Sequence, residues 1–171
     1  MDYSEILTIP PYSLGKVEKT KLLTERMKQL TLHHMECCTE YKKMLESIGF
    51  DIEQAKSYYD YPFLPVRLFK ELSLASVAEE EVFKTMTSSG TTGQAVSRIY
   101  LDKVTASNQQ KTMVKIVTDY TGAGRMPMLI IDCPSVVKDR KMFSARGAGI
   151  LGFSIFGADG EGRAYGTYHR E

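Results

Sequence analysis

The chain has 171 residues, 43% of them hydrophobic, and its 22 basic residues nearly cancel its 21 acidic ones. That length and composition suffice for one hydrophobic core, so we expect a single domain. The near-neutral charge, without a long block of like charge, argues against nucleic acid as a partner. No apolar stretch reaches the roughly 20 residues that a membrane-spanning helix needs, so no membrane span is expected.

The N-terminal segment MDYSEILTIPPYSLGK has neither a basic start nor an apolar core, so it does not resemble an export signal. The three cysteines, Cys37, Cys38 and Cys133, do not form the spaced, even-numbered set that is typical of a disulfide framework. Both features favour a cytoplasmic protein.

The first third of the chain is predicted to be helical. Apolar side chains recur at helical spacing over residues 16–48, which predicts one long amphipathic helix. Asp51 is expected to cap a second, short helix through Tyr59, because Gln54 lies where a capping box needs an acceptor. The two prolines of the following segment, YPFLPVRLF, predict an extended connector.

A β-hairpin is predicted over residues 82–101. Two β-prone runs, Val82–Thr87 and Val96–Leu101, flank the segment SSGTTG, so that segment is expected at the hairpin tip.

An α/β unit is predicted over residues 102–157, and a polar tail over 158–171. Strands that alternate with helices of this length favour an α/β layer structure. The elements expected within the unit are a helix over 102–120 capped by Asp102 or Thr105, an apolar strand over Met128–Ile131 covered on both faces, a small-residue helix over Ala145–Leu151, and a strand over Phe153–Phe156.

The segment SSGTTG, residues 88–93, holds four hydroxyl side chains and two glycines. Glycines allow the backbone to approach a ligand closely, so that consecutive N–H groups and hydroxyls can surround an anion such as a triphosphate. Ser, Thr and Gly also populate ordinary loops, so composition alone leaves both interpretations open. A Walker P-loop is excluded, because Gln94 rather than Lys follows Gly93.

The order SSGTTG resembles the phosphate loop of the adenylate-forming superfamily. The segments PFLPVRLFKELSL, TSSGTTGQAVSRIYLD, PMLIIDCPS and FSARGAGILGFSIFG are similar to the acyl-protein synthetase family, LuxE type, and the resemblance covers residues 14–157. It implies N-terminal helices, a β-hairpin phosphate loop and part of a layered α/β sheet domain of the adenylate-forming type.

The resemblance implies that ATP and a fatty acid form an acyl adenylate, whose acyl group passes to a protein thiol and on to an acyl reductase. In that family the pathway is related to bioluminescence, and Mg²⁺ accompanies the nucleotide. The implied phosphate-binding residues are Ser88, Ser89, Gly90, Thr91, Thr92 and Gly93. Gln94 and Arg98 are possible accessory residues, although an arginine on a strand is equally expected on a solvated face.

The resemblance does not extend to the family's downstream motifs. The adenine motif, the ribose-binding aspartate and the lid lysine are not located, since Tyr165–His169 begins like the adenine motif but departs from it. None of the three cysteines matches the family's acyl-accepting cysteine, and no catalytic residue is assigned. The chain therefore resembles an N-terminal, partial domain, with weak ATP binding and little turnover expected alone. The alternative is a non-catalytic remnant or binding module that docks on an acyl reductase.

Three further patterns carry weaker signals. The segment HHMECC, residues 33–38, pairs histidines and cysteines four apart, but adjacent helical residues point about 100° apart, so no metal site is expected. The glycines of GAGILG, residues 147–152, fit a dinucleotide motif without its strand context, so they indicate close helix packing or the border of an acyl pocket. Asp132 follows an apolar strand and is a candidate site residue or a turn cap with Pro134.

Overall fold

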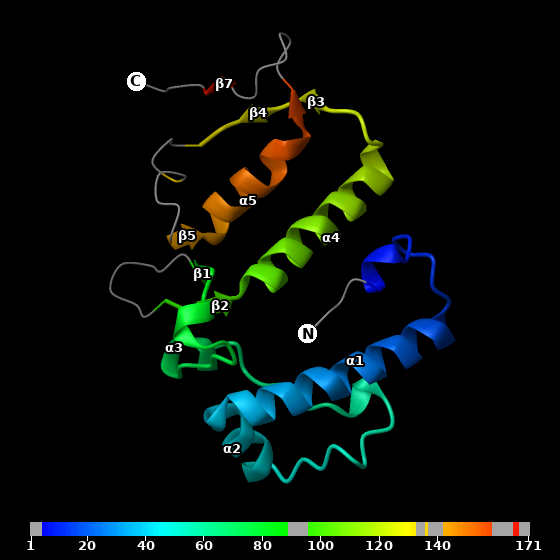
Figure 1. The fold of residues 1–171 in the computed structure, drawn as a ribbon, viewed down its shortest axis with the longest axis vertical. Helices are drawn as coiled ribbons and strands as arrows, with labels where there is room; N and C mark the ends of the chain where they lie inside the picture. The colour runs from blue at the N-terminus through cyan, green and yellow to red at the C-terminus, as the bar shows by residue number, and fades with distance from the viewer. Residues whose placement is uncertain (1–4, 89–95, 133–135, 137–141, 159–165, 168–171) are drawn as a thin grey trace.

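The computed structural model describes residues 5–88, 96–132, 136, 142–158 and 166–167. Figure 1 shows α1 and α2 at one end of the molecule, α4 and α5 at the other, and α3 with the β1–β2 hairpin along one side. The α-helices are α1 (Lys16–Cys37), α2 (Thr39–Ser47), α3 (Leu68–Glu71), α4 (Lys103–Thr121) and α5 (Ala145–Phe153). The 3₁₀ turns are η1 (Ile6–Thr8), η2 (Tyr58–Asp60), η3 (Glu79–Glu81) and η5 (Ser154–Phe156).

The strands are short and form three small sheets among the described residues. They are β1 (Lys84–Thr87), β2 (Arg98–Leu101), β3 (Met126–Pro127), β4 (Leu129–Ile130), β5 (Met142–Ser144), β6 (Gly157–Ala158) and β7 (Gly166–Thr167). Strand β1 pairs antiparallel with β2 and parallel with β5, while β3 pairs with β6 and β4 with β7, both in parallel. Helices combined with parallel and antiparallel strands agree with the predicted α/β class.

The predicted long helix over 16–48 is interrupted at Cys38. The backbone of Cys38 is extended (φ −131°, ψ 102°) and separates α1 from α2. Cys37, Cys38 and Thr39 are three consecutive weak helix formers, so a break there costs little. The break buries the Cys38 side chain and lets α2 place Leu45 fully inside the protein. The apolar periodicity of the sequence continues across the break, which is why periodicity alone did not reveal it.

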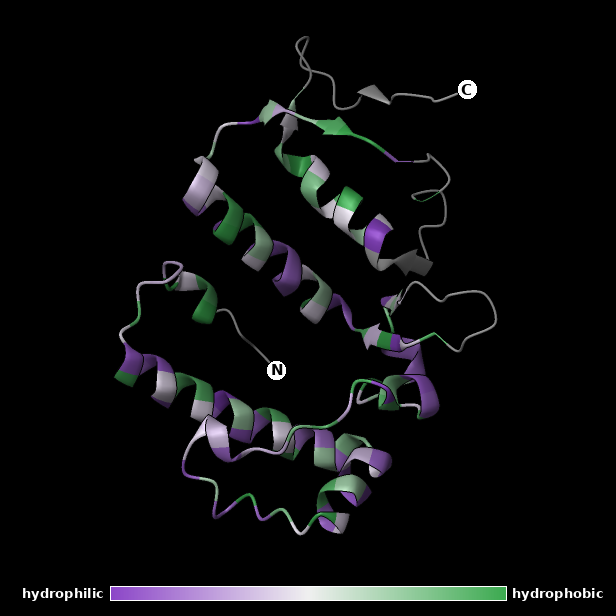
Figure 2. Cartoon of the chain, turned by 180° about the vertical axis from the view of Figure 1, so that it is seen from behind, coloured by the Kyte–Doolittle hydropathy of each residue, from purple (hydrophilic) through white to green (hydrophobic). Residues whose placement is uncertain are grey.

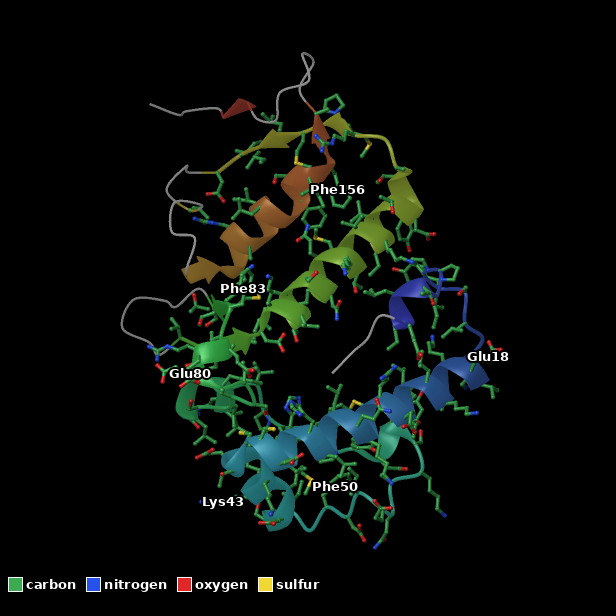
Figure 3. The ribbon with its side chains drawn as sticks, viewed as in Figure 1. Glu18, Lys43, Phe50, Glu80, Phe83 and Phe156 are labelled. Carbon is green, nitrogen blue, oxygen red and sulfur yellow. The ribbon has the colours of Figure 1, made fainter. Side chains whose placement is uncertain are left out.

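The short helix predicted from Asp51 to Tyr59 does not form. The Asp51 carboxylate instead accepts hydrogen bonds from the backbone N–H of Glu53 (3.0 Å) and the side chain of Gln54 (2.8 Å), which closes a local turn. Side-chain acceptors of this kind compete with helical hydrogen bonding. The chain then forms η2, and Phe50, labelled in Figure 3, packs its ring 5.5 Å from that of Tyr61.

The hairpin and the helix that follows it were predicted closely. The register of β1 and β2 pairs Lys84 with Leu101 and Thr87 with Arg98. Helix α4 begins after Asp102, whose carboxylate accepts a hydrogen bond from the Thr105 N–H at 2.5 Å, so Asp102 is the N-cap. The N-cap of α4 thus lies directly after the second hairpin strand.

The two strands predicted in the last third differ from the structure. The apolar run Met128–Ile131 contains β4, but Leu129 and Ile131 are 62% and 83% exposed, so the run is not covered on both faces. Figure 2 shows this apolar strand at an edge of the molecule. The predicted strand Phe153–Phe156 is helical, because α5 continues into η5, where the rings of Phe153 and Phe156 lie 6.1 Å apart. Phe156, labelled in Figure 3, is buried.

Helices α4 and α5 approach each other closely through Gly152. A Cβ atom at Gly152 would lie 3.3 Å from Cε and Sδ of Met113 on α4. The side-chain amide of Gln110 also reaches the Gly152 carbonyl, at 3.5 Å. A Cβ atom at Gly149 would meet nothing within 4 Å. The contact at Gly152 therefore supports the helix-packing interpretation of the GAGILG motif.

These two glycines generate opposite predictions for stability. Gly149→Ala should raise the free energy of unfolding by about 0.5–1 kcal/mol, because alanine is the better helix former and the added methyl has room. Gly152→Leu should lower it by about 1–3 kcal/mol, because the larger side chain overpacks the contact with Met113. Urea unfolding followed by circular dichroism measures both. Equal effects of the two changes would contradict the packing assignment.

Candidate functional site

The stem of the β1–β2 hairpin is closed by a pair of serines. The Ser88 N–H donates to the Ser97 carbonyl (3.2 Å), and the Ser97 N–H donates to Ser88 Oγ (3.0 Å). Ser97 is buried. The backbone N–H of Ser88 is thus already used in the stem, whereas its hydroxyl proton is still able to donate to a ligand.

Most of the predicted phosphate loop lies outside the described residues, namely Ser89, Gly90, Thr91, Thr92, Gly93 and Gln94. Arg98 is described and exposed, opposite Thr87 at the loop end of β2. Ser88 and Arg98 are thus the predicted site residues that the structure describes, and their role in phosphate binding stays a prediction.

A cavity of about 630 Å³ adjoins the hairpin stem. Its lining comes from α1 and α2, from the connector over residues 62–77, from strand β2 and from the start of α4. This volume lies within the range of about 300–1,000 Å³ that is usual for small-molecule pockets. The sequence did not predict this cavity. The available signal was the apolar character of the connector, with Leu64 between its two prolines and Leu68, Phe69 and Leu74 after them.

A hydrogen bond between His34 and Ser76 joins two sides of the cavity lining. His34 Nδ1 lies 2.7 Å from Ser76 Oγ, which ties α1 to the connector. The His34 ring also packs edge-on against Tyr41 of α2, with centroids 5.8 Å apart. Burial, and to a smaller extent the neighbouring His33, lowers the pKa of the His34 imidazole. The neutral imidazole is therefore favoured near neutral pH.

The HHMECC segment does not gather its side chains at one point. Cys37 Sγ lies 3.7 Å from His33 Nδ1 on the exposed side of α1, while His34 faces Ser76 and Cys38 is buried beyond the helix end. Over the part of the chain that the structure describes, no group of three or more His, Cys, Asp or Glu side chains could hold a metal ion.

Asp132 lies at the end of the β4 segment and pairs with α5. Its Oδ2 atom is 3.0 Å from Nε of Arg146, and its side chain is 17% exposed against 67% for that of the arginine. Cys133 and Pro134 lie outside the described residues, and the proposed turn cap lies there with them. The sequence contained no signal for this ion pair, because its two residues are 14 positions apart. A partly exposed ion pair of this kind contributes little to stability.

The described part of the chain is thus a mixed α/β protein in which strand β2 of a hairpin lines an apolar cavity. Comparison with protein families identifies the class: the family "Acyl-protein synthetase, LuxE" matches residues 2–157. The chain belongs to the LuxE acyl-protein synthetase family. Searches of curated proteins and of solved structures gave no match. No helix among the described residues is long and apolar enough to cross a membrane.

The lowered pKa of His34 gives a prediction for the pH dependence of stability. Because the folded state binds fewer protons than the unfolded state just below the ordinary histidine pKa of 6.5, the free energy of unfolding should fall as the pH drops through that region. His34→Gln should reduce this loss. Thermal melts of both proteins between about pH 7.5 and pH 5 measure the difference, and identical pH profiles would contradict the assignment.

Proposed function

We propose that this chain acts in the ATP-dependent activation of a fatty acid as an acyl adenylate, for transfer of the acyl group to a protein thiol. Membership of the LuxE acyl-protein synthetase family is the observation that carries the proposal. The antiparallel pairing of β1 with β2 supports it, because the segment SSGTTG lies between these two strands in the sequence.

In the proposed reaction a carboxylate oxygen of the fatty acid attacks the α-phosphorus of ATP. A new P–O bond forms, the bond to the β-phosphate oxygen breaks, and pyrophosphate leaves. Residues Ser88–Gly93 are proposed to hold the phosphates through hydroxyl and backbone donors, with Gln94 and Arg98 as accessory residues. Magnesium bound with the nucleotide would neutralise phosphate charge, and no described residue is assigned as its ligand.

The proposed partners follow from the same chemistry. The fatty acid is the co-substrate, and the thiol ester that results is a substrate for an acyl reductase protein in the cytoplasm. The lack of turnover in an otherwise folded chain would favour the alternative, a binding module that docks on such a reductase.

The primary test is ATP-dependent release of pyrophosphate in the presence of fatty acids of different length, measured together with ATP affinity by calorimetry. We expect this chain to bind ATP. We expect fatty-acid-dependent release of pyrophosphate from a form of the protein that also carries the family's downstream motifs. If ATP neither binds nor raises the melting temperature, the proposal is wrong.

The loop itself is tested by the double variant Thr91→Ala, Thr92→Ala. A hydrogen bond to a charged oxygen contributes about 1.5–3 kcal/mol, so the loss of two should weaken ATP binding by about a hundredfold or more. The matched control is Thr118→Ala, Thr121→Ala on α4, where both hydroxyls donate to carbonyls of their own helix. Equal affinity in the loop variant and the wild-type protein would remove the loop from the mechanism.

A further inference from the structure

The cavity beside the hairpin has an apolar wall built from distant parts of the chain. Helix α1 contributes Leu30, the connector contributes Leu68, Phe69 and Leu74, and strand β2 contributes Ile99 and Leu101. Leu101 is only 6% exposed, so the wall continues into buried structure. Burial of apolar ligand surface against such a wall is favourable and roughly proportional to the area removed from water.

The charges around the cavity restrict what can occupy it. No Lys or Arg is among the described residues that line it, and the pKa of His34 is lowered, so a fixed positive charge is lacking there. Asp102 lines the cavity as well, and the hydrogen bond from the Thr105 N–H lowers the pKa of its carboxyl group. An ionised Asp102 repels a second carboxylate. The interior therefore suits an uncharged hydrocarbon, with any carboxylate kept away from α4.

Strand β2 lines one side of the cavity, and residues of opposite charge lie at its two ends. The strand leads from Ser97 at the hairpin stem, past Ile99, to Asp102 at the N-cap of α4. Because Asp102 occupies one end of this wall, a carboxylate is expected at the other end, near Arg98 and the stem. Arg98 is exposed there, so its guanidinium is accessible to an anion.

We propose that the hydrocarbon chain of the fatty acid binds in this cavity, with its carboxylate toward the hairpin stem, and that the connector over residues 62–77 limits the chain length that is accepted. The identity of the ligand rests on the proposed function, whereas its location rests on the lining and its charges. Ala75 of the connector lines the cavity with a small side chain, so a larger residue at this position tests the limit on chain length.

The experiment measures displacement of a fluorescent fatty acid by saturated fatty acids of increasing length, without ATP. Each buried methylene should tighten binding by roughly fourfold until the cavity is full. Ala75→Phe should move this limit to shorter acids and weaken palmitate binding by about tenfold or more. The control Ala55→Phe, outside the lining, should reproduce the wild-type series. Identical series for Ala75→Phe and wild type would overturn the proposal.

Crosslinking with a diazirine-labelled fatty acid tests the location in the unmodified chain, so that it does not depend on the folding of a variant. Mass spectrometry should place the crosslinks in the connector and β2. A second cavity, of about 570 Å³, lies against Ile6, α4 and Phe153 of α5. Crosslinks at this second cavity, or crosslinking that does not saturate as the fatty-acid concentration rises, would overturn the proposal. If crosslinks form in the connector but the chain does not bind ATP, the cavity still binds the fatty acid and the proposed activation reaction is wrong.

Discussion

The backbone pairing of β1 on both of its sides is the interaction on which the arrangement of the site depends. Along one edge β1 bonds to β2, which forms the hairpin, and along the other it bonds to β5, which leads directly into α5. These sheet hydrogen bonds join the hairpin to the strand that precedes α5. Figure 1 shows the hairpin along one side of the molecule, between the level of α1 and α2 and the level of α4 and α5. Strand β1, which precedes the proposed phosphate-binding segment, is therefore hydrogen-bonded along both edges.

Strand β2 belongs both to the hairpin and to the lining of the cavity. Strand β2 follows the glycine-rich segment in the sequence and provides part of the apolar wall of the cavity. Asp102, the N-cap of α4, comes directly after it. The proposed reaction requires a carboxylate and a phosphate to be held in contact, and a strand shared by the two proposed sites would bring them together. The hydrogen bond between His34 and Ser76 supports the opposite wall, because it joins α1 to the connector.

Local chemistry predicted some elements well and others poorly. The hairpin and α4 were predicted closely because β-branched runs, the Asp102 cap and Gly122 are short-range signals. The break at Cys38 and the exposure of β4 were missed because they depend on tertiary packing, which the apolar pattern does not encode. The family was recognised from sequence order and agrees with the family comparison. The phosphate-binding residues remain a prediction, and the cavity was missed because it is lined by segments that lie far apart in the sequence.

The helix break at Cys38 leaves two neighbouring thiols with different exposure to solvent. Cys37 is exposed on the last turn of α1, whereas Cys38 is 4% exposed and lines the cavity. Oxidants and alkylating reagents attack accessible thiolates, so the first sulfur reacts and the second is protected for as long as the protein stays folded. The rate at which Cys38 becomes labelled therefore reports how often α1 and α2 separate from the connector.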